Sequence, residues 1–231
     1  FEISKKNNMI KINKLLKIKS PQIISELGIN HEGNIDLAKK MVNLIFKSGG
    51  QIIKNQSHDL KKEMSAHAKK IKPSNANKSI YSVIKENYMK FDDEVKLKRY
   101  VEKKNMLYIS TPFSIDSAIR LNELNVKIFK IGSGEFNNIP LIEKIAKFKK
   151  PMILSTGMND LKSINETVVV LKKNKIQFSL LHCISEYPAQ YKNLKLDFIS
   201  KLKKNFKNIT IGYSDHSNSI FPCIIAMAKG A

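Results

Sequence analysis

The sequence lacks any uninterrupted apolar stretch of the ~20 residues that a membrane-spanning helix requires. Its opening segment, FEISKKNNMIKINKLLKIK, carries lysines throughout, whereas a secretory leader has a basic head followed by a clean apolar run. We therefore expect neither secretion nor membrane insertion, no membrane partner, and a cytoplasmic location.

Cysteine is scarce. Cys183 and Cys223 stand alone in the sequence, with no CxxC pair and no spacing typical of metal ligands. This pattern fits reduced thiols in a cytoplasmic protein.

Arginine is nearly absent, although the chain is strongly basic, with a formal net charge of +21 at pH 7. Arg99 and Arg120 are the only arginines, and the lysines are scattered through helix-like stretches instead of forming one stripe. Specific nucleic-acid readers use arginine forks and stacking aromatic side chains, and neither pattern is evident here. A solvated lysine-rich surface is the favoured interpretation, and a basic module that binds polyanions or nucleic acid is kept as a rival.

What the 231-residue chain does contain is a regular alternation of short β-rich runs and helix-like stretches, with 42% hydrophobic residues to build a core. After the first run, Leu37, Met41, Leu44 and Ile45 trace one face of a predicted helix. The predicted strands lie at 22–30, 51–57, 106–113, 128–136, 151–158, 177–185 and 208–216.

Strand–helix alternation predicts a parallel α/β sheet, because consecutive parallel strands need a crossover. No GxGxxG follows the first strand, and polar residues end nearly every strand instead of gathering at one switch point. We therefore predict a (β/α)8 TIM-type barrel that lacks its eighth β/α unit. Residues 1–20 form a basic lead-in, and 21–231 form the incomplete catalytic barrel.

In such a barrel the functional groups come from the carboxyl ends of different strands. Two lysines, several hydroxyls and glycine-opened amides at these ends predict a pocket for a small, multiply charged anion such as a phosphate or carboxylate. Glu26 and Glu135 are candidate general bases beside it. His216, flanked by Ser214 and Asp215, is a candidate metal ligand.

Each of these residues also has a structural interpretation. A lysine at a strand end is often an ion-pair partner, and a serine or threonine there often caps the next helix. His182, which follows two leucines, is expected in or near the core. The other histidines, His31, His58 and His67, fall in predicted loops and are expected at the surface.

Seven segments follow one another along the chain: ISELGINHEGNIDLAKKMV, IIKNQSH, YISTPFS, FKIGSGEFNNIPLI, PMILSTGM, LLHCISEYP and IGYSDHS. Taken together and in this order, they resemble the bacterial N-acetylneuraminate (sialic acid) synthases, including legionaminate-type members. The resemblance runs from about Pro21 to the end of the chain. It implies condensation of phosphoenolpyruvate with N-acetylmannosamine or a related amino sugar, with loss of phosphate by C–O cleavage and assistance from Mn²⁺ or Mg²⁺.

The resemblance also implies roles for individual residues. Glu26 would be the acid/base residue or stabilise a cationic intermediate, Glu135 would lie near the substrate, and His216 would be one of two metal-binding histidines. The implied contacts to the amino sugar are Gln56, Asn75 and Tyr187. The implied contacts to the phosphate and carboxylate of phosphoenolpyruvate are Lys54, Thr111, Lys130, Ser133, Ser155, Ser185 (where some members carry Asn) and Ser214.

Parts of the resembled family have no counterpart before Ala231. These are the second metal-binding histidine with its strand, and the antifreeze-like C-terminal domain that covers the partner's sugar site in a homodimer. We therefore expect residues 1–231 alone to be inactive or nearly so. Another phosphoenolpyruvate-dependent aldol-type sugar-acid synthase is a rival, but it needs a second phosphate site and no arginine-rich cluster is present to form one.

Overall fold

The structure is a computed structural model that describes residues 21–72 and 77–231. The predicted lead-in over 1–20 lies outside the described residues. The described strands are all parallel and follow one another in sequence order across a single curled sheet. They are β1 (Ile24–Gly28), β2 (Ile52–Ser57), β3 (Leu107–Pro112), β4 (Phe129–Ile131), β5 (Met152–Ser155), β6 (Phe178–Cys183) and β7 (Thr210–Ser214).

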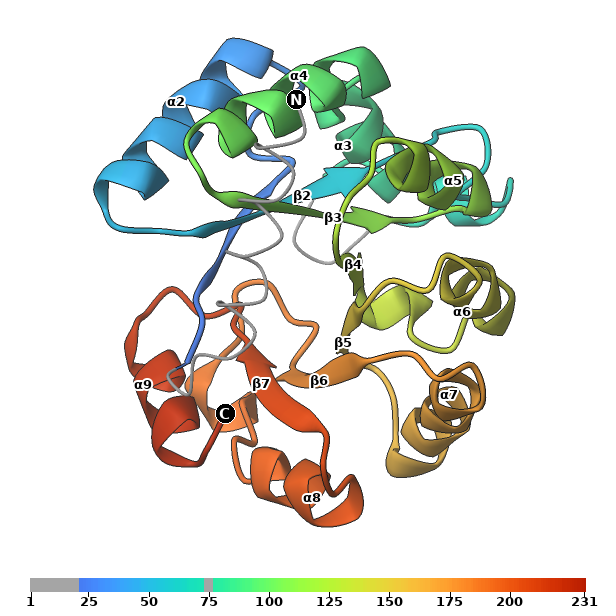
Figure 1. Cartoon of the computed structure of the whole chain (residues 1–231), viewed down its shortest axis with the longest axis vertical. Helices are drawn as coiled ribbons and strands as arrows, with labels where there is room; N and C mark the ends of the chain where they lie inside the picture. The colour runs from blue at the N-terminus through green and yellow to red at the C-terminus, as the bar shows by residue number, and fades with distance from the viewer. Residues whose placement is uncertain (1–20, 73–76) are drawn as a thin grey trace.

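Helices connect these strands and surround the sheet on its outer side (Figure 1). The predicted fold class is therefore confirmed, since the described chain forms a TIM-like barrel without an eighth β/α unit. The helices are α2 (Ile35–Lys47), α3 (Ile80–Asn87), α4 (Phe91–Lys103), α5 (Ile115–Glu123), α6 (Ile139–Ala146), α7 (Leu161–Lys173), α8 (Phe198–Asn205) and α9 (Phe221–Ala228), with short 3-10 turns η1 (Ala68–Lys70), η2 (Ser133–Glu135) and η3 (Tyr191–Asn193).

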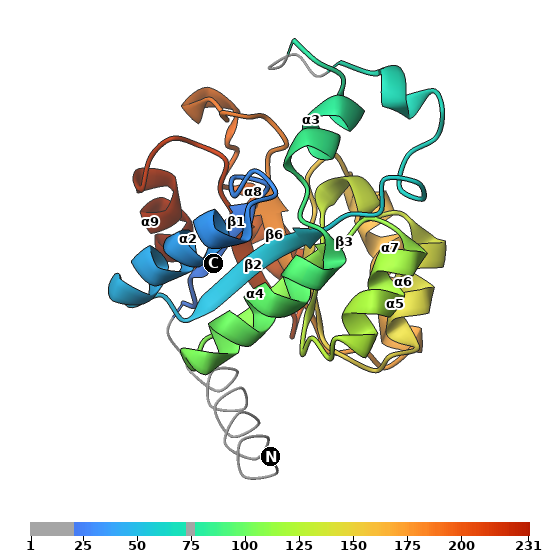
Figure 2. The same ribbon diagram turned by 90° about the horizontal axis from the view of Figure 1, so that it is seen from above.

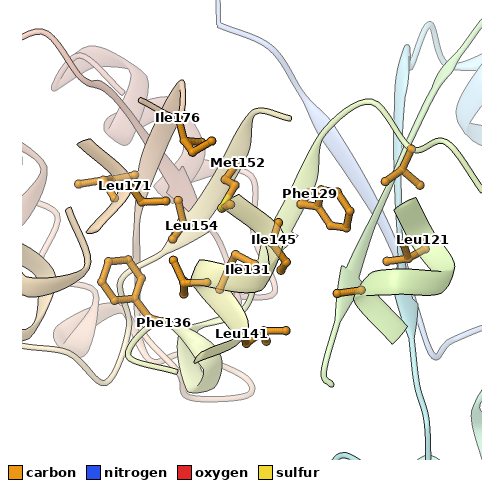
Figure 3. Close-up of a cluster of buried hydrophobic side chains, with 14 of the residues drawn as sticks. Leu121, Phe129, Ile131, Phe136, Leu141, Ile145, Met152, Leu154, Leu171 and Ile176 are labelled. Carbon is orange, nitrogen blue, oxygen red and sulfur yellow. The ribbon is translucent and has the colours of Figure 1, made fainter. Parts of the chain in front are cut away.

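Two hydrophobic clusters show which way each strand residue faces. The larger cluster joins the outer face of the sheet to the helices, and Figure 3 shows Phe129, Ile131 and Leu154 of the strands beside Leu141 and Ile145 of α6. The smaller cluster lies on the concave face and comprises Ile52, Leu107, Ile109 and Ile128, with Ile24 and Ile153 packed against it.

Because side chains alternate along a strand, residues two positions beyond the concave cluster share its face at the carboxyl ends of the strands. The register between neighbouring strands extends this face to β6 and β7, because Ser155 pairs with Leu181 and Cys183 pairs with Ser214. We call this set of concave side chains the barrel mouth: Glu26, Lys54, Gln56, Thr111, Lys130, Ser155, Cys183 and Ser214.

Local sequence explains where several helices begin. The side chains of Asn34, Ser79, Ser114, Asn138 and Asp160 each accept a backbone N–H in the first turn of the next helix. The interpretation of strand-end hydroxyls as helix caps is therefore wrong for Thr111 and Ser155, because other residues cap α5 and α7. Those two hydroxyls belong to the barrel mouth and do not cap a helix.

Some predicted boundaries and faces differ from the structure. The strand predicted over 128–136 ends at Ile131, where the chain turns into η2. On α2 the fully buried residues are Ala38 and Val42, and Leu44, predicted to face the core, is 65% exposed. The segment between β2 and α4 contains α3, which projects from one end of the molecule (Figure 2).

None of the helices in residues 21–72 and 77–231 combines the length and the apolar character that a membrane crossing needs.

Candidate active site

Two lysines, Lys54 of β2 and Lys130 of β4, lie in the barrel mouth in different environments. Lys54 forms an ion pair with Glu26, the residue opposite it on β1. The expectation that a strand-end lysine is an ion-pair partner is therefore confirmed for Lys54. Lys130 is 4% exposed, and within the described residues it has no carboxylate at ion-pair distance. Its Nζ donates to Ser155 Oγ at 2.7 Å and to the carbonyl of Ile131 at 2.8 Å.

The environment of Lys130 is costly for a positive charge. Burial, and then the nearby charge of Lys54, lower the pKa of Lys130 to about 7, although Glu26 partly offsets them. A bound anion would restore the charge balance, because its negative oxygens would face both ammonium groups. The pair of lysines is therefore built for an anion more than for an isolated salt bridge.

Two buried hydroxyl groups at the strand ends have no hydrogen-bond partner among residues 21–72 and 77–231. They are Thr111 Oγ1 and Ser185 Oγ. Buried hydroxyls normally find partners, so two unpaired ones beside a cationic pocket are suited to donate to a ligand. The side chain of Thr111 also approaches the end of β4, with its methyl 3.9 Å from a Cβ built on Gly132.

Gly157 leaves room for the hydroxyl of Ser185 and for that of Ser133. A Cβ at this position would lie 2.6 Å from Ser185 Oγ and 2.8 Å from Ser133 Oγ. A third neighbour, the carbonyl of Cys183, would lie at 3.2 Å. The glycine that follows β5 thus keeps open the space beside both hydroxyls.

On the far side of the mouth, a thiol and an imidazole are in contact. Cys183 Sγ lies 3.5 Å from Ser133 Oγ and 3.8 Å from His216 Nδ1. The same Nδ1 bonds the carbonyl of Ile184 at 2.7 Å, and Nε2 lies 3.2 Å from the hydroxyl of Tyr187. The rings of Tyr187 and His216 are 4.1 Å apart between centroids.

Contact between Cys183 and His216 shifts both of their pKa values. Burial raises the pKa of Cys183, but hydrogen bonds from His216 and Ser133 outweigh burial and lower it below its ordinary value. Burial lowers the pKa of His216, but the hydrogen bond and charge of Cys183 outweigh burial and raise it. Cys183 was predicted only as a reduced thiol, but its position two residues after Leu181 on β6 indicates that it faces the mouth.

Not every predicted site residue joins these contacts. Glu135 Oε2 accepts from Asn138 at 2.6 Å, so this carboxylate bonds the N-cap residue of α6. Ser214 ends β7 beside Cys183, at the rim of the mouth. Asn75, predicted to contact the sugar, lies outside the described residues. The ligand roles inferred from the resemblance therefore stay predictions.

Two histidines expected at the surface are buried instead. His31 is 1% exposed and His58 is 6% exposed. His31 Nε2 lies 3.2 Å from Asn55 Oδ1, and its Nδ1 accepts the backbone N–H of Gly33 at 3.1 Å. These partners belong to β2 and the β1 loop, so neither contact was evident from local sequence. His182 was correctly placed in the core, at 3% exposure.

Behind the mouth, on the outer face of β2 and β3, lies a buried carboxylate that sequence analysis missed. Glu94 of α4 is 2% exposed, and its oxygens accept from the hydroxyls of Ser57 at 2.7 Å, Tyr108 at 2.8 Å and Ser110 at 2.8 Å. Burial raises the pKa of Glu94, although the hydroxyl donors partly offset this. Glu94 thus ties α4 to the two strands that carry Lys54 and Thr111 into the mouth.

The described residues do not by themselves complete a metal centre. No group of three His, Cys, Asp or Glu side chains in the described part of the chain is arranged to hold a metal ion. His216 offers one imidazole nitrogen, Nε2, which is close to Tyr187. Since Mn²⁺ and Mg²⁺ favour several oxygen ligands, one imidazole is insufficient and metal assistance stays a prediction.

Comparison with known proteins places this site in a family. The model of the NeuB family matches residues 41–231. The chain belongs to the NeuB family. The match spans β2 to α9, which includes every described residue of the mouth except Glu26 of β1.

Individual relatives of this NeuB-family chain agree in sequence and in fold. It is 39% identical over 221 residues to the N,N'-diacetyllegionaminic acid synthase of Campylobacter jejuni, an alignment that covers 93% of this chain and 66% of the relative. It is 33% identical to the N-acetylneuraminate-9-phosphate synthase of Homo sapiens, covering 90% of this chain and 59% of the relative.

Among solved structures, the sialic acid synthetase of Leptospira borgpetersenii in complex with citrate superposes with a TM-score of 0.82 at 33% identity, covering 92% of this chain and 71% of that one. The chain spans about two thirds or less of the length of these two curated relatives, at 66% and 59%.

Proposed function

We propose that this chain carries the phosphoenolpyruvate-binding part of a NeuB-type nonulosonic acid synthase, whose reaction joins phosphoenolpyruvate to N-acetylmannosamine or a related amino sugar. The observation that carries the proposal is Lys130, a buried lysine with no carboxylate partner in the described chain, beside the second cation of Lys54. Membership of the NeuB family supports the same substrate class.

In the proposed site the two lysines supply charge and the hydroxyls supply directed donors to the phosphate and carboxylate of phosphoenolpyruvate. Thr111 and Ser185 would gain their missing partners. The remaining donors would be Ser133, Ser155 and Ser214, from the ends of β4, β5 and β7. These fixed groups would position the anion before reaction and stabilise charge as it moves.

The chemistry proposed for this site is addition of the enol carbon of phosphoenolpyruvate to the open-chain aldehyde of the sugar. A carbon–carbon bond forms as the C=O π bond of the aldehyde breaks, the aldehyde oxygen takes up a proton to become a hydroxyl, and positive charge develops on the carbon that carries the phosphate. Water attacks that carbon and loses a proton, and the tetrahedral intermediate then expels phosphate by cleavage of its C–O bond. Glu26 would stabilise the cation or accept the proton of water, since its ion pair with Lys54 holds it at the mouth. A metal, where bound, would polarise the aldehyde oxygen.

Binding of phosphoenolpyruvate to the purified chain tests this proposal. We expect saturable 1:1 binding in isothermal titration calorimetry at pH 7. Because Lys130 has a pKa of about 7 and must be protonated to pair with the anion, affinity should fall by up to about tenfold per pH unit above 7. Binding at pH 8 should take up about one proton, measured in buffers of different ionisation enthalpy.

A duplex DNA titration at two salt concentrations separates this proposal from the polyanion-binding rival. A specific site should retain phosphoenolpyruvate binding at a salt concentration that abolishes duplex binding, since nonspecific affinity falls steeply with salt. Absence of any saturable phosphoenolpyruvate binding would refute the proposal.

The space beside Gly157 gives a second prediction. Gly157→Ala places a methyl group within 3 Å of Ser133 Oγ and Ser185 Oγ, so both hydroxyls must move. We expect phosphoenolpyruvate to bind about tenfold more weakly, with little change in the unfolding midpoint. Gly134→Ala is a matched control, because a Cβ there meets no atom within 4 Å. Equal affinities for the two variants would contradict this account of the site.

A further inference from the structure

A buried histidine–carboxylate pair lies in the loop after β2, beside Gln56 of the mouth. His58 Nδ1 lies 2.9 Å from Glu63 Oε2, and His58 Nε2 lies 3.0 Å from Gln56 Oε1. The side chains of His58 and Glu63 are 1% and 2% exposed. Neither residue contacts the lysines or hydroxyls of the proposed anion site in these interactions, so their role is not yet explained.

The surroundings fix the imidazole in place. Its ring stacks on Phe113 with centroids 4.5 Å apart and planes 5° from parallel. Glu63 Oε2 also accepts the backbone N–H of Asp59 at 3.1 Å, and the carboxylate of Asp59 is in an ion pair with Arg120 of α5. The loop is therefore tied to a helix, and His58 has little freedom to rotate.

The partners of the two ring nitrogens determine where protons lie. Nε2 faces an amide oxygen, which only accepts, so Nε2 carries a proton and donates to Gln56. The other ring nitrogen shares a proton with a carboxylate oxygen. With its oxygen occupied, Gln56 has its amide N–H groups left to offer, and a Cβ built on Gly28 would lie 3.8 Å from this amide nitrogen and 3.5 Å from Glu26 Oε1, so both groups lie near the end of β1.

We propose that Glu63 and His58 are positioning residues that hold the Gln56 amide with its N–H donors toward the mouth, so that the site selects a sugar with an acceptor there, such as an N-acyl carbonyl. The sugar part rests on the proposed function. If the Glu63 carboxylate is removed, the His58 imidazole keeps one proton on Nδ1, and its Nε2 becomes a hydrogen-bond acceptor. The Gln56 amide must then turn so that its N–H donates to Nε2. The Gln56 oxygen would then face the mouth in place of the N–H donors.

Nitrogen-15 NMR of the imidazole at pH 7 tests the amide orientation without any ligand. In the unsubstituted chain, we expect His58 Nε2 to be protonated. In Glu63→Gln we expect Nε2 to lose that proton, while Glu86→Gln, which changes an exposed ion pair with Lys78, leaves it unchanged. An unprotonated Nε2 in the unsubstituted chain would overturn the proposal even if Glu63→Gln failed to fold.

Sugar titrations in saturating phosphoenolpyruvate test selectivity. We expect Glu63→Gln to bind N-acetylmannosamine about tenfold more weakly, with mannosamine binding and phosphoenolpyruvate affinity within twofold of the unsubstituted chain. Equal selectivity in both proteins, or no sugar binding by the unsubstituted chain, would overturn the selectivity claim. Failure to bind phosphoenolpyruvate would refute the proposed function instead, and the NMR result would still decide the role of Glu63 and His58.

Discussion

Lys130→Met should strongly weaken phosphoenolpyruvate binding while making the protein more stable. The substitution removes the buried ammonium that lies beside Ser155 and Lys54. A hydrogen bond to a charged group contributes about 1.5–3 kcal/mol, so we expect the dissociation constant to rise by about 10- to 150-fold. Calorimetric titration at pH 7 measures this loss.

The expected gain in stability follows from the same pKa. In the folded protein the pKa of Lys130 is about 7, below its unfolded value of about 10.4. Between these values the folded state binds fewer protons than the unfolded state, so this lysine lowers stability progressively as pH falls from 10 to 7. Methionine removes that penalty but also removes the two hydrogen bonds that Lys130 donates. As the net of these two effects, we expect the free energy of unfolding at pH 7 to rise by about 1 kcal/mol.

Lys150→Met is the control for this experiment. Burial, and then the charges of Lys127 and Lys98, lower the pKa of Lys150 to about 8, but this lysine precedes β5 and lies at the opposite end of the strands from the mouth. Lys150→Met should change the affinity for phosphoenolpyruvate by less than about twofold relative to the unsubstituted chain. Loss of binding in both variants would show that general positive charge, and not the site, holds the anion.

Glu94→Ala should cause the largest loss of stability among the changes considered. It leaves the hydroxyls of Ser57, Tyr108 and Ser110 without their common acceptor in a buried region. Each unsatisfied buried group costs about 1–3 kcal/mol, so we expect the free energy of unfolding to fall by about 4 kcal/mol in urea denaturation. A loss below about 1 kcal/mol would show that water or rearrangement replaces the carboxylate.

Glu94→Gln is the matched variant, because its amide oxygen still accepts hydroxyl donors. Burial raises the pKa of Glu94 in the folded state, so its contribution to stability is fully present below the unfolded pKa of about 4.3 and falls as pH rises. The destabilisation caused by glutamine should therefore be larger at pH 4.5 than at pH 7. The opposite trend would contradict the assigned direction of the pKa shift.

Sequence alone predicted the strand order and most of the mouth for a physical reason. In a barrel, the end of each parallel strand faces one rim, so Lys54, Lys130 and Ser155 could be brought together without knowing any contact. Period-two alternation also indicates the concave side, yet the sequence analysis passed over Cys183, which that alternation places beside His216.

The misses share a different cause. Glu94, His31 and His58 are polar residues whose partners lie on other elements, and only the packing of α4 or the course of the loop after β2 brings those partners close. Leu44 was misplaced because a helix with apolar residues on more than one side does not reveal which side meets the sheet. Local pattern therefore predicted the concave face well and the outer polar network poorly.

The positive charge of the chain affects how its two edge strands in the described sheet, β1 and β7, meet other copies of the protein. Within residues 21–72 and 77–231 neither strand has a further strand at its outer side. Such edge strands can serve as templates for association between copies. A net charge of +21 repels one copy from another over a Debye length of about 8 Å at physiological salt. Repulsion of this kind would oppose pairing of β1 or β7 with a strand of another copy of the chain.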